Sequence, residues 1–371
     1  MSGRTRRTRL AHAGSGEGPG VVPPIELSTT FPRGTDYALA GPDIYRRDQN
    51  ATVRAAEAAL ADVEGAADAR LFASGMAAIA ALFRAADGPI LVQDSAYYGT
   101  GKLIERLAAR QTITTFPIGD LSALSAACEA HRPALVFIET PANPLITVTA
   151  IDEAAAIAHS VGAILGVDGT AATPMVTRPL EHGADIVAHS ATKGLNGHSD
   201  VLAGVLATGA PSALWDRVLE ARAVEGAVLS PFDASLLLRG MRTLALRIAA
   251  MNESALHIAD WLAAHPRVLR VRYPGLPSDP GHDVARRQME GFGGLLAFEV
   301  ENAAAALRVA GRLSLITRAT SLGGTETLIE HRHSIEPSWT GVPEGLLRLS
   351  VGIESVGDLV ADLAEGLAAL D

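Results

Sequence analysis

The sequence of 371 residues is short of cysteine, and this scarcity excludes two kinds of site. Its single cysteine, Cys128, can form neither an internal disulfide nor a metal site built from several thiolates. Cys128 lies in the alanine-rich helical pattern LSALSAACEA, so we expect a small buried side chain and not a reactive thiol. The spacing of the histidines matches no usual ligand set, and we therefore predict no metal site. The histidines considered are His182, His189, His198, His331 and His333.

Long apolar runs and excess positive charge are also absent. No apolar run reaches the roughly 18 residues that a membrane-spanning helix needs, so no contact with a membrane is expected. The formal net charge of −10 argues against nucleic acid as the main partner. Four arginines near the N-terminus are followed by AHAGSGEGPG, which lacks the apolar segment of an export signal. We therefore expect a cytoplasmic protein.

The chain is long enough for two domains, a larger one over residues 44–234 and a smaller α+β domain over residues 235–371. Residues 1–43 are rich in glycine and proline and lack periodicity, which predicts an extended arm that can pack on a neighbouring subunit. One long amphipathic pattern over residues 233–264 predicts a single helix that leads into the smaller domain. Shorter strands are predicted after it, at residues 268–275, 293–300 and 346–354.

The larger domain is predicted to be a doubly wound, mainly parallel sheet, because apolar segments alternate with helical patterns. A helix is expected over residues 51–64, ending near Gly65, and another is expected to begin around residues 74–76. In such sheets, ligands bind beyond the carboxyl ends of the strands. The predicted strands are residues 88–94, 112–118, 134–140, 163–170, 184–190 and 201–208.

Lys193 follows the apolar strand 184–190, among hydroxyl and turn residues. Burial lowers the pKa of a lysine, and the neutral amine can form a Schiff base with an aldehyde. An ordinary lysine between strand and loop is the simpler interpretation of this residue alone. The rest of the chain changes the balance, because it supplies the other groups that such a lysine requires.

Two further segments suit a charged heterocycle. Asp168 ends a predicted strand, where a buried carboxylate needs a cation such as a protonated pyridine nitrogen, although aspartates often cap turns there. Ser74, Gly75 and Met76 lie where a loop enters a helix, and amide groups at such a place can hold a phosphate. A serine N-cap explains this tripeptide equally well. It is no GxGxxG motif, so a dinucleotide site is not predicted.

Aromatic and basic residues offer further contacts to such a ligand. Tyr97 and Tyr98 follow a predicted strand, and either ring could lie on a flat heterocycle; for Tyr98 we expect a contact that seals the loop onto the core. Tyr45 and Arg47 suit a phosphate or a solvated loop. Arg348 interrupts an apolar strand and therefore needs an anion, either an internal carboxylate or that of a substrate.

Together these segments resemble the Cys/Met-metabolism family of pyridoxal-phosphate (PLP) enzymes, the group of cystathionine γ-lyase, cystathionine γ-synthase and methionine γ-lyase. The resemblance spans nearly the whole chain in family order. It implies the fold type I of PLP-dependent transferases, PLP as the cofactor, and at least a dimer with shared active sites, usually a homotetramer. The segments are VVPPIELSTTF, YRRDQNAT, FASGMAAI, DSAYYGT, ETPANPL, VDGTAATP, HSATKGLNGHSDVLAG, SLGGTETL and RLSVGIE.

The resemblance also implies a role for each matching residue. Lys193 would hold the cofactor and move protons between carbons, Asp168 would pair with the pyridine nitrogen, and Tyr97 would stack on the ring and protonate a leaving group. The remaining residues would bind the cofactor or the substrate. The phosphate cradle would consist of Gly75, Met76, Ser190 and Thr192, with Tyr45 and Arg47 from a neighbouring subunit. Thr170 and Asn143 would lie near the ring, and the substrate carboxylate would be held by Arg348, Ser321 and Asn143.

Departures from the family pattern bear on the substrate. Cystathionine lyases tend to have acidic residues at the positions of Ile44 and Thr320, and methionine γ-lyases tend to have a cysteine at the position of Gly99. The segment IEHRHSIEP, residues 329–337, replaces the PAxMTH stretch of many members and resembles a bacterial subgroup usually assigned as cystathionine γ-lyase. We therefore expect a C–S lyase that performs γ-elimination on L-cystathionine or a related thioether amino acid, giving a thiol, ammonia and an α-keto acid. The alternatives are γ-replacement, as in cystathionine γ-synthase or an O-acyl-homoserine sulfhydrylase, and methionine γ-lyase activity.

Overall fold

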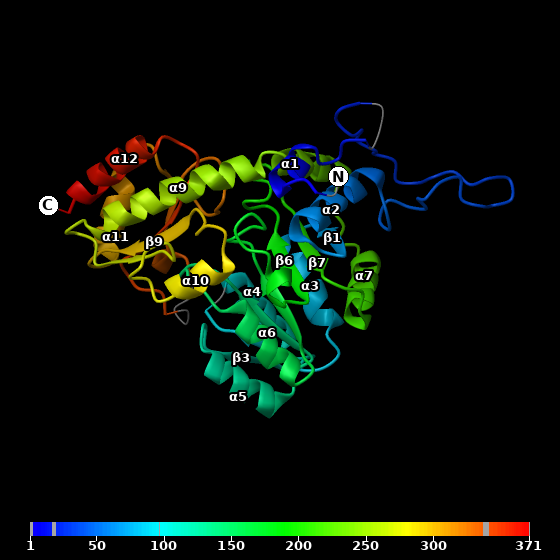
Figure 1. Cartoon of the computed structure of the whole chain (residues 1–371), viewed down its shortest axis with the longest axis horizontal. Coiled ribbons are helices and arrows are strands. Elements are labelled where there is room, and N and C mark those ends of the chain that lie inside the picture. The colour runs from blue at the N-terminus through cyan, green and yellow to red at the C-terminus, as the bar shows by residue number, and fades with distance from the viewer. Residues whose placement is uncertain (1–2, 17–19, 96, 337–340, 371) are drawn as a thin grey trace.

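The computed structural model describes residues 3–16, 20–95, 97–336 and 341–370. A seven-stranded sheet with helices on both faces forms the larger part of the molecule, in the spatial order β1-β7-β6-β5-β4-β2-β3 (Figure 1). Strands β2 to β6 pair in parallel, and β7 is antiparallel to both of its neighbours. The doubly wound, mainly parallel sheet predicted from the sequence is therefore confirmed. Its strands are β1 (Asp68–Phe72), β2 (Ile90–Gln93), β3 (Ile113–Phe116), β4 (Leu135–Glu139), β5 (Ile164–Asp168), β6 (Ile186–Ser190) and β7 (Gly204–Thr208).

Alternate residues of the strands are buried on opposite faces of this sheet. In β4, Leu135 and Phe137 pack with α3, α4 and α7, whereas Val136 and Ile138 pack with α5 and α6. Cys128 of α5 is buried in the second of these clusters, as the sequence predicts. The helices of this part are α2 (Ala51–Glu64), α3 (Gly75–Ala85), α4 (Tyr98–Leu107), α5 (Leu121–His131), α6 (Ile151–Ser160), the 3₁₀ helix η1 (Pro179–His182) and α7 (Ala213–Glu225).

Local capping signals set the first helix boundaries. The side chain of Asn50 accepts the amide hydrogens of Thr52 and Val53 and so begins α2, and Gly65 ends it at a φ of 69°, where glycine is favoured. Ser74 begins α3 in the same way by accepting the amide hydrogen of Ala77. These boundaries agree with those predicted from the sequence.

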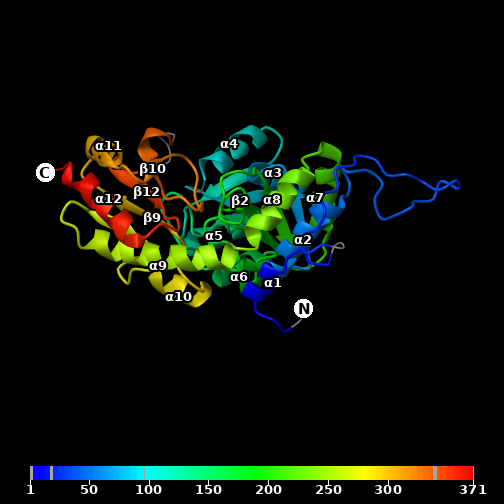
Figure 2. The same ribbon diagram turned by 90° about the horizontal axis from the view of Figure 1, so that it is seen from above.

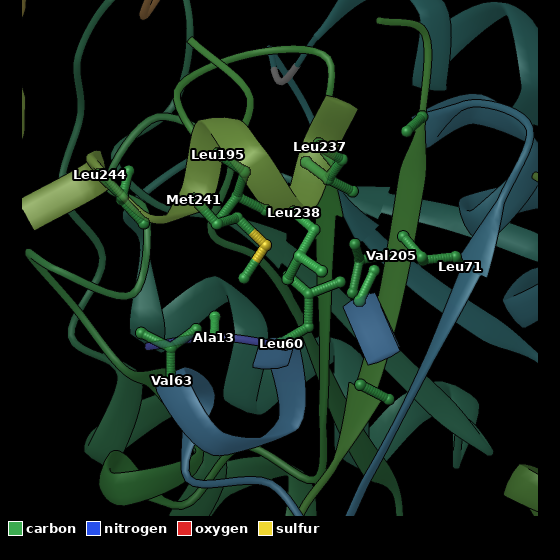
Figure 3. Packing of buried hydrophobic residues seen from close by; sticks show 14 of the residues in the cluster. Ala13, Leu60, Val63, Leu71, Leu195, Val205, Leu237, Leu238, Met241 and Leu244 are labelled. Atoms are coloured by element: carbon green, nitrogen blue, oxygen red, sulfur yellow. The ribbon is translucent and has the colours of Figure 1, made fainter. Parts of the chain in front are cut away.

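A third cluster of buried side chains joins α2, β1, β7 and α8 (Figure 3). Leu60 and Val63 of α2 meet Val205 of β7 and Met241 of α8 there, and Leu195 reaches the cluster from the loop after β6. The loop that carries Lys193 therefore rests on a hydrophobic base.

A second sheet of five strands, in the order β10-β11-β12-β9-β8, forms the smaller part of the molecule. Helix α9 connects the two parts, because its first half packs with Met241 and its second half with Leu347 and Leu363 of the smaller part (Figures 1 and 2). No helix within the described ranges is long and apolar enough to cross a membrane. The remaining elements are α8 (Pro231–Met241), α9 (Leu244–Ala263), β8 (Arg270–Arg272), α10 (His282–Gln288), β9 (Leu295–Glu299), α11 (Ala303–Arg312), β10 (Thr317–Arg318), β11 (Leu328–His331), the 3₁₀ helix η2 (Arg332–Ser334), β12 (Leu346–Ser350) and α12 (Val356–Ala368).

The single helix predicted over residues 233–264 is wrong, because the structure has two helices with a break at Arg242 and Thr243. The hydrophobic pattern continues across the break because both helices pack on the same cluster. The break lets Gly240 lie against the loop after β6, where a Cβ would come within 2.3 Å of the carbonyl oxygen of Asn196.

The segment predicted to be an arm contains one short helix, α1 (Arg6–Ala11), which the sequence analysis did not anticipate. The guanidinium of Arg6 donates to the carbonyl oxygen of Pro174 at 2.6 Å, and that of Arg9 contacts Asp62 of α2 at 2.8 Å. After it, residues 20–45 are hydrogen-bonded to α2 near both ends, through Pro24, Glu26 and Asp43, and between these anchors the chain extends away from the body of the molecule (Figures 1 and 2). Their exposed apolar side chains include Val21, Val22, Leu27, Tyr37 and Leu39.

We predict that Gly204→Ala lowers the free energy of unfolding by about 2 kcal/mol, since overpacking displaces backbone or side chains. A Cβ at Gly204 would lie 2.1 Å from the carbonyl oxygen of Ser74 and 2.7 Å from the amide nitrogen of Gly75. Urea denaturation measures the change. Gly311→Ala is the control, because a Cβ there meets no atom within 4 Å and alanine favours the helix. Equal destabilisation by both substitutions would contradict the close approach.

Candidate active site

A cavity of about 180 Å³ lies at the carboxyl ends of β4, β5 and β6, between the large sheet and the smaller part of the chain. Every site residue predicted from the sequence lines it except Tyr45 and Arg47. Tyr45 ends the extending segment and Arg47 follows it, with its guanidinium 5.5 Å from the centre of the Tyr45 ring. The predicted residues that line the cavity are Gly75, Met76, Tyr97, Asn143, Asp168, Thr170, Ser190, Thr192, Lys193, Ser321 and Arg348.

Lys193 points its amine across the cavity to the smaller part of the chain. Its Nζ donates to the Oγ of Ser321 at 3.0 Å. Burial, and then the positive charge of Arg348, lower the pKa of Lys193. Ser321 has a φ of 140°, a strained value for a residue with a side chain. The amine is therefore held by a residue of the other part and shifted toward its neutral form.

Asp168 is buried at the end of β5 and serves two purposes. Its Oδ1 accepts the amide hydrogen of Thr170 at 2.9 Å and the hydroxyl hydrogen of Thr170 at 2.5 Å, as in a turn cap. Its Oδ2 makes no hydrogen bond to any residue that the structure describes, and the side chain lines the cavity. Burial raises the pKa of Asp168, against the lowering effect of Thr170 and of nearby His189. The carboxylate can therefore cap the turn and still bind a cation in the cavity.

Behind Asp168 lies a buried pair that the sequence analysis did not identify as part of the site. The Nε2 of His189 contacts a carboxylate oxygen of Glu64, and both side chains are almost completely buried. Burial disfavours the charged imidazole, but the Glu64 carboxylate raises the pKa of His189 overall. The pair therefore favours the protonated form of an imidazole that interacts electrostatically with Asp168.

The N-terminus of α3 forms a cradle for an anion. Ser74 caps Ala77, so the amide hydrogens of Gly75 and Met76 have no partner within the helix and the helix dipole adds positive potential. Ser190 lies against this turn, since a Cβ at Gly75 would come within 2.9 Å of the Ser190 Cβ. Thr192 lines the same wall, and its hydroxyl donates to the carbonyl oxygen of Ala203 at 3.2 Å and accepts the amide hydrogen of Ala203 at 2.9 Å. This set of donors fits a phosphate group.

Glu139, which the sequence places at a strand end without a role, fastens the loops on either side of it. Its two carboxylate oxygens accept the amide hydrogens of Tyr97 at 2.7 Å and of Asn143 at 2.8 Å. Burial, and then Asp168, raise the pKa of Glu139 to about 8. Burial and Tyr98 raise the pKa of Tyr97 to about 12, so its hydroxyl keeps its proton near neutral pH. Tyr98 also lines the cavity, beside Tyr97. The sequence predicts only a contact that seals the loop onto the core.

Arg348 is paired with an internal carboxylate, that of Glu330, which is one of the two anions predicted from the sequence. Its guanidinium donates to the Oδ1 of Asn143 and to the carbonyl oxygen of Ser321, both at 2.7 Å, and contacts Glu330 at 2.6 Å. Burial is the main reason that the pKa of Arg348 falls to about 10. Arg332 also lines the cavity and contacts Glu330 at 2.5 Å. The sequence did not predict that Glu330 and Arg332 form a buried pair. The only signal for it is that these two charged residues follow the apolar residues Leu328 and Ile329 of β11.

The histidines of this segment are structural. His331 contacts the Oγ of Ser334 at 2.7 Å and the carbonyl oxygen of Glu344 at 2.6 Å. Within the described ranges, no group of histidine, cysteine and acidic side chains is arranged to hold a metal ion.

The lowered pKa of Lys193 predicts a dependence of stability on pH in protein free of bound ligands. Unfolding restores the ordinary pKa, so the unfolded state binds more protons and stability rises with pH up to about 10. Lys193→Met removes this contribution. We expect the stability of wild type relative to Lys193→Met to increase between about pH 7 and about pH 10 in urea denaturation. Lys102→Met, at an exposed lysine, is the control. A pH-independent difference would show that the amine is not disfavoured in its charged form.

Comparison with known proteins places this geometry in a family. The family model for Cys/Met metabolism PLP-dependent enzymes matches residues 7–368. The cystathionine gamma-synthase of Mycobacterium tuberculosis is 42% identical, over 97% of this chain and 96% of that protein. The cystathionine gamma-lyase of Dictyostelium discoideum is 41% identical, over 97% of each chain. The crystal structure of cystathionine gamma synthase from Xanthomonas oryzae pv. oryzae in complex with aminoacrylate and cysteine has a TM-score of 0.95 at 37% identity, over 99% of each chain. The chain belongs to the Cys/Met metabolism family of PLP-dependent enzymes.

Proposed function

We propose that this PLP-dependent enzyme acts at the γ-carbon of a sulfur-containing amino acid, by γ-elimination on L-cystathionine or a related thioether amino acid. The observation that carries the proposal is the convergence of Lys193, Asp168 and Arg348 on one cavity. An amine, a carboxylate for a ring nitrogen and a guanidinium for a carboxylate are the groups that such a reaction requires. The products would be a thiol, ammonia and an α-keto acid.

The donors in the cavity fit the cofactor. The amide hydrogens of Gly75 and Met76, with the hydroxyls of Ser190 and Thr192, would hold its phosphate, and the free oxygen of Asp168 would pair with its ring nitrogen. Lys193 would bind its aldehyde, and Tyr97 and Thr170 would lie beside its ring. When bound, PLP supplies an aldehyde that reacts with amines and a ring that withdraws electrons from the substrate α-carbon.

The chain's own groups would then position the substrate and move its protons. Arg348 and Asn143, joined at 2.7 Å, would hold the α-carboxylate together with Ser321. The neutral Nζ of Lys193 would take the α-proton and move protons between neighbouring carbons, since burial favours its neutral form. The Tyr97 hydroxyl, which keeps its proton near neutral pH, would donate it to the leaving sulfur.

A second reaction, γ-replacement on an activated homoserine ester, is favoured by the similarity to the Mycobacterium tuberculosis cystathionine gamma-synthase. The two reactions share the loss of the γ-substituent, and they differ in whether a thiol then adds. Thr320, at a position where cystathionine lyases tend to have an acidic residue, lines the cavity and donates its hydroxyl hydrogen to the Oε1 of Glu330 at 2.6 Å.

We also propose that the active site is shared between subunits of a homotetramer in the cytoplasm. The support is the segment of residues 20–45, part of which extends away from its own body (Figure 2) and whose apolar side chains Val21, Leu27 and Tyr37 are exposed, as expected for a surface that packs on another subunit. Tyr45 and Arg47 would reach the phosphate of the neighbouring subunit's site. The cytoplasmic setting is the expectation from the sequence, and no contact of the described residues bears on it.

The proposal predicts that Lys193→Ala removes the visible absorbance of the covalently bound cofactor and lowers turnover by at least about a hundredfold, since it deletes the general base. Wild type would be assayed with L-cystathionine, L-methionine and O-succinyl-L-homoserine, with and without L-cysteine. Thiol and α-keto acid from L-cystathionine alone would support elimination. Cystathionine formed only from the ester and cysteine would assign replacement instead. A wild type that binds no PLP would reject both reactions.

Subunit mixing tests the shared site. Lys193→Ala and Arg47→Ala would each be nearly inactive, but refolding them together in equal amounts should restore about a quarter of wild-type activity. This follows because about half of the dimers are hybrids with one intact site, if Arg47 acts in the neighbour's site. No recovery on mixing, with full assembly by light scattering, would place Arg47 in its own subunit's site.

A further inference from the structure

Two arginines and two glutamates form a buried charged cluster on the wall of the cavity: Glu330, Arg332, Glu336 and Arg348. Their side chains are between 1% and 7% exposed. Glu330 and Arg348 are directly opposite each other on the antiparallel strands β11 and β12, and Arg332 follows in η2. The resemblance assigns a substrate-binding role only to Arg348.

Glu330 is the centre of this cluster, because both arginines use the same oxygen. Its Oε2 lies 2.6 Å from the Nη2 of Arg348 and 2.5 Å from the Nη1 of Arg332. Its Oε1 accepts the hydroxyl hydrogen of Thr320 at 2.6 Å. Arg332 also contacts Glu336 through its Nη2. Glu330 is therefore an ion-pair partner of both Arg332 and Arg348.

The sharing decides how much positive charge Arg348 can offer to a ligand. A carboxylate paired with a single buried arginine neutralises it, and a substrate carboxylate would then meet Glu330 as a like charge. Because Arg332 is present, the negative charge of Glu330 is shared between the two arginines. Glu336 balances the positive charge of Arg332 on its other side. The Nε of Arg348 is buried without a hydrogen-bond partner in the described residues, so this guanidinium retains capacity to donate.

We propose that Arg332 is a positioning residue that shares the Glu330 carboxylate with Arg348 and thereby keeps Arg348 able to bind the substrate α-carboxylate. The inference rests on the proposed function in assigning the α-carboxylate to Arg348. It gives Arg332 no direct contact with the substrate, so its effect should be the same for any α-amino acid.

The test compares two ligands for the PLP-loaded enzyme, read by the change in cofactor absorbance at equilibrium. L-Norleucine carries an α-carboxylate and no leaving group, and n-pentylamine is the same molecule without the carboxylate. The ratio of their dissociation constants measures the preference for a carboxylate. Arg332→Gln should reduce this preference by about tenfold to a hundredfold, the range of one charge-assisted hydrogen bond. The dissociation constant of n-pentylamine should change little.

The decisive variant is the double substitution Glu330→Gln/Arg332→Gln. Removing the carboxylate that Arg332 restrains should return the preference to within about threefold of wild type, because the coupling between the two residues is lost. Arg332→Lys and Glu330→Gln alone should keep the preference. Arg287→Gln, which breaks an exposed ion pair with Glu153, is the control for loss of an arginine.

A double variant as impaired as Arg332→Gln would overturn the proposal, because Arg332 would then contact the ligand itself. A loss of preference in Glu330→Gln alone would overturn it too, since Glu330 would then be required to orient Arg348. If Arg332→Gln fails to bind PLP, the Arg332→Lys and Glu330→Gln variants still decide. A wild type without preference for L-norleucine, or an unchanged preference in Arg348→Leu, would reject the proposed function instead.

Discussion

A buried guanidinium, Arg247, fastens the loop that carries Lys193 to the junction of the two parts of the chain. It is 4% exposed and donates to the carbonyl oxygens of Gly194 at 2.9 Å, Leu195 at 3.2 Å and Gly240 at 2.9 Å. These carbonyls come from the loop after β6 and from the last turn of α8, so one side chain satisfies backbone groups of both. Arg247 itself lies in α9, the helix that packs on both hydrophobic cores. The position of the reactive amine therefore depends on the same contact that orders the two parts relative to each other.

Electrostatic balance is the second constraint on the cavity. Burial pushes Lys193 toward its neutral form and raises the pKa values of Asp168 and Glu139, so each group is disfavoured in its charged state without a partner. Burial also lowers the pKa of Arg348, but the Glu330 carboxylate beside it opposes this shift. A ligand with a cationic ring nitrogen would supply the positive partner that Asp168 lacks. A carboxylate of the same ligand would supply a second negative partner for Arg348, which already contacts Glu330. The cavity is therefore better matched to a zwitterionic amino acid on a charged heterocycle than to a neutral ligand.

The sequence predicted what local physics determines, and it failed where distant residues decide. Helix α2 was bounded correctly because Asn50 and Gly65 are sufficient signals by themselves. Each predicted strand of the large sheet is present, and the inner strands such as β4 and β7 are apolar because they are buried on both faces, whereas the edge strand β3 is partly exposed. The break at Thr243 was missed because the hydrophobic pattern runs through it. The contact between Glu330 and Arg332 was not predicted because it depends on the pairing of β11 with β12 and on the turn after β11, which hydrophobic periodicity does not describe. Several residues of the candidate site, among them Asn143, Thr170 and Ser321, were assigned only through the resemblance to the family.

Ser321 connects catalysis to conformational stability. Its backbone has a φ of 140°, a region in which residues with side chains are strained, and its hydroxyl accepts the bond from Lys193 across the cavity. Its carbonyl oxygen also accepts from Arg348. A glycine would relax this backbone but would leave the amine without its partner, so the requirement for a side chain opposes the requirement for an unstrained chain. If Ser321 has its proposed role, a substitution that relaxes the backbone at position 321 would stabilise the fold and weaken the site.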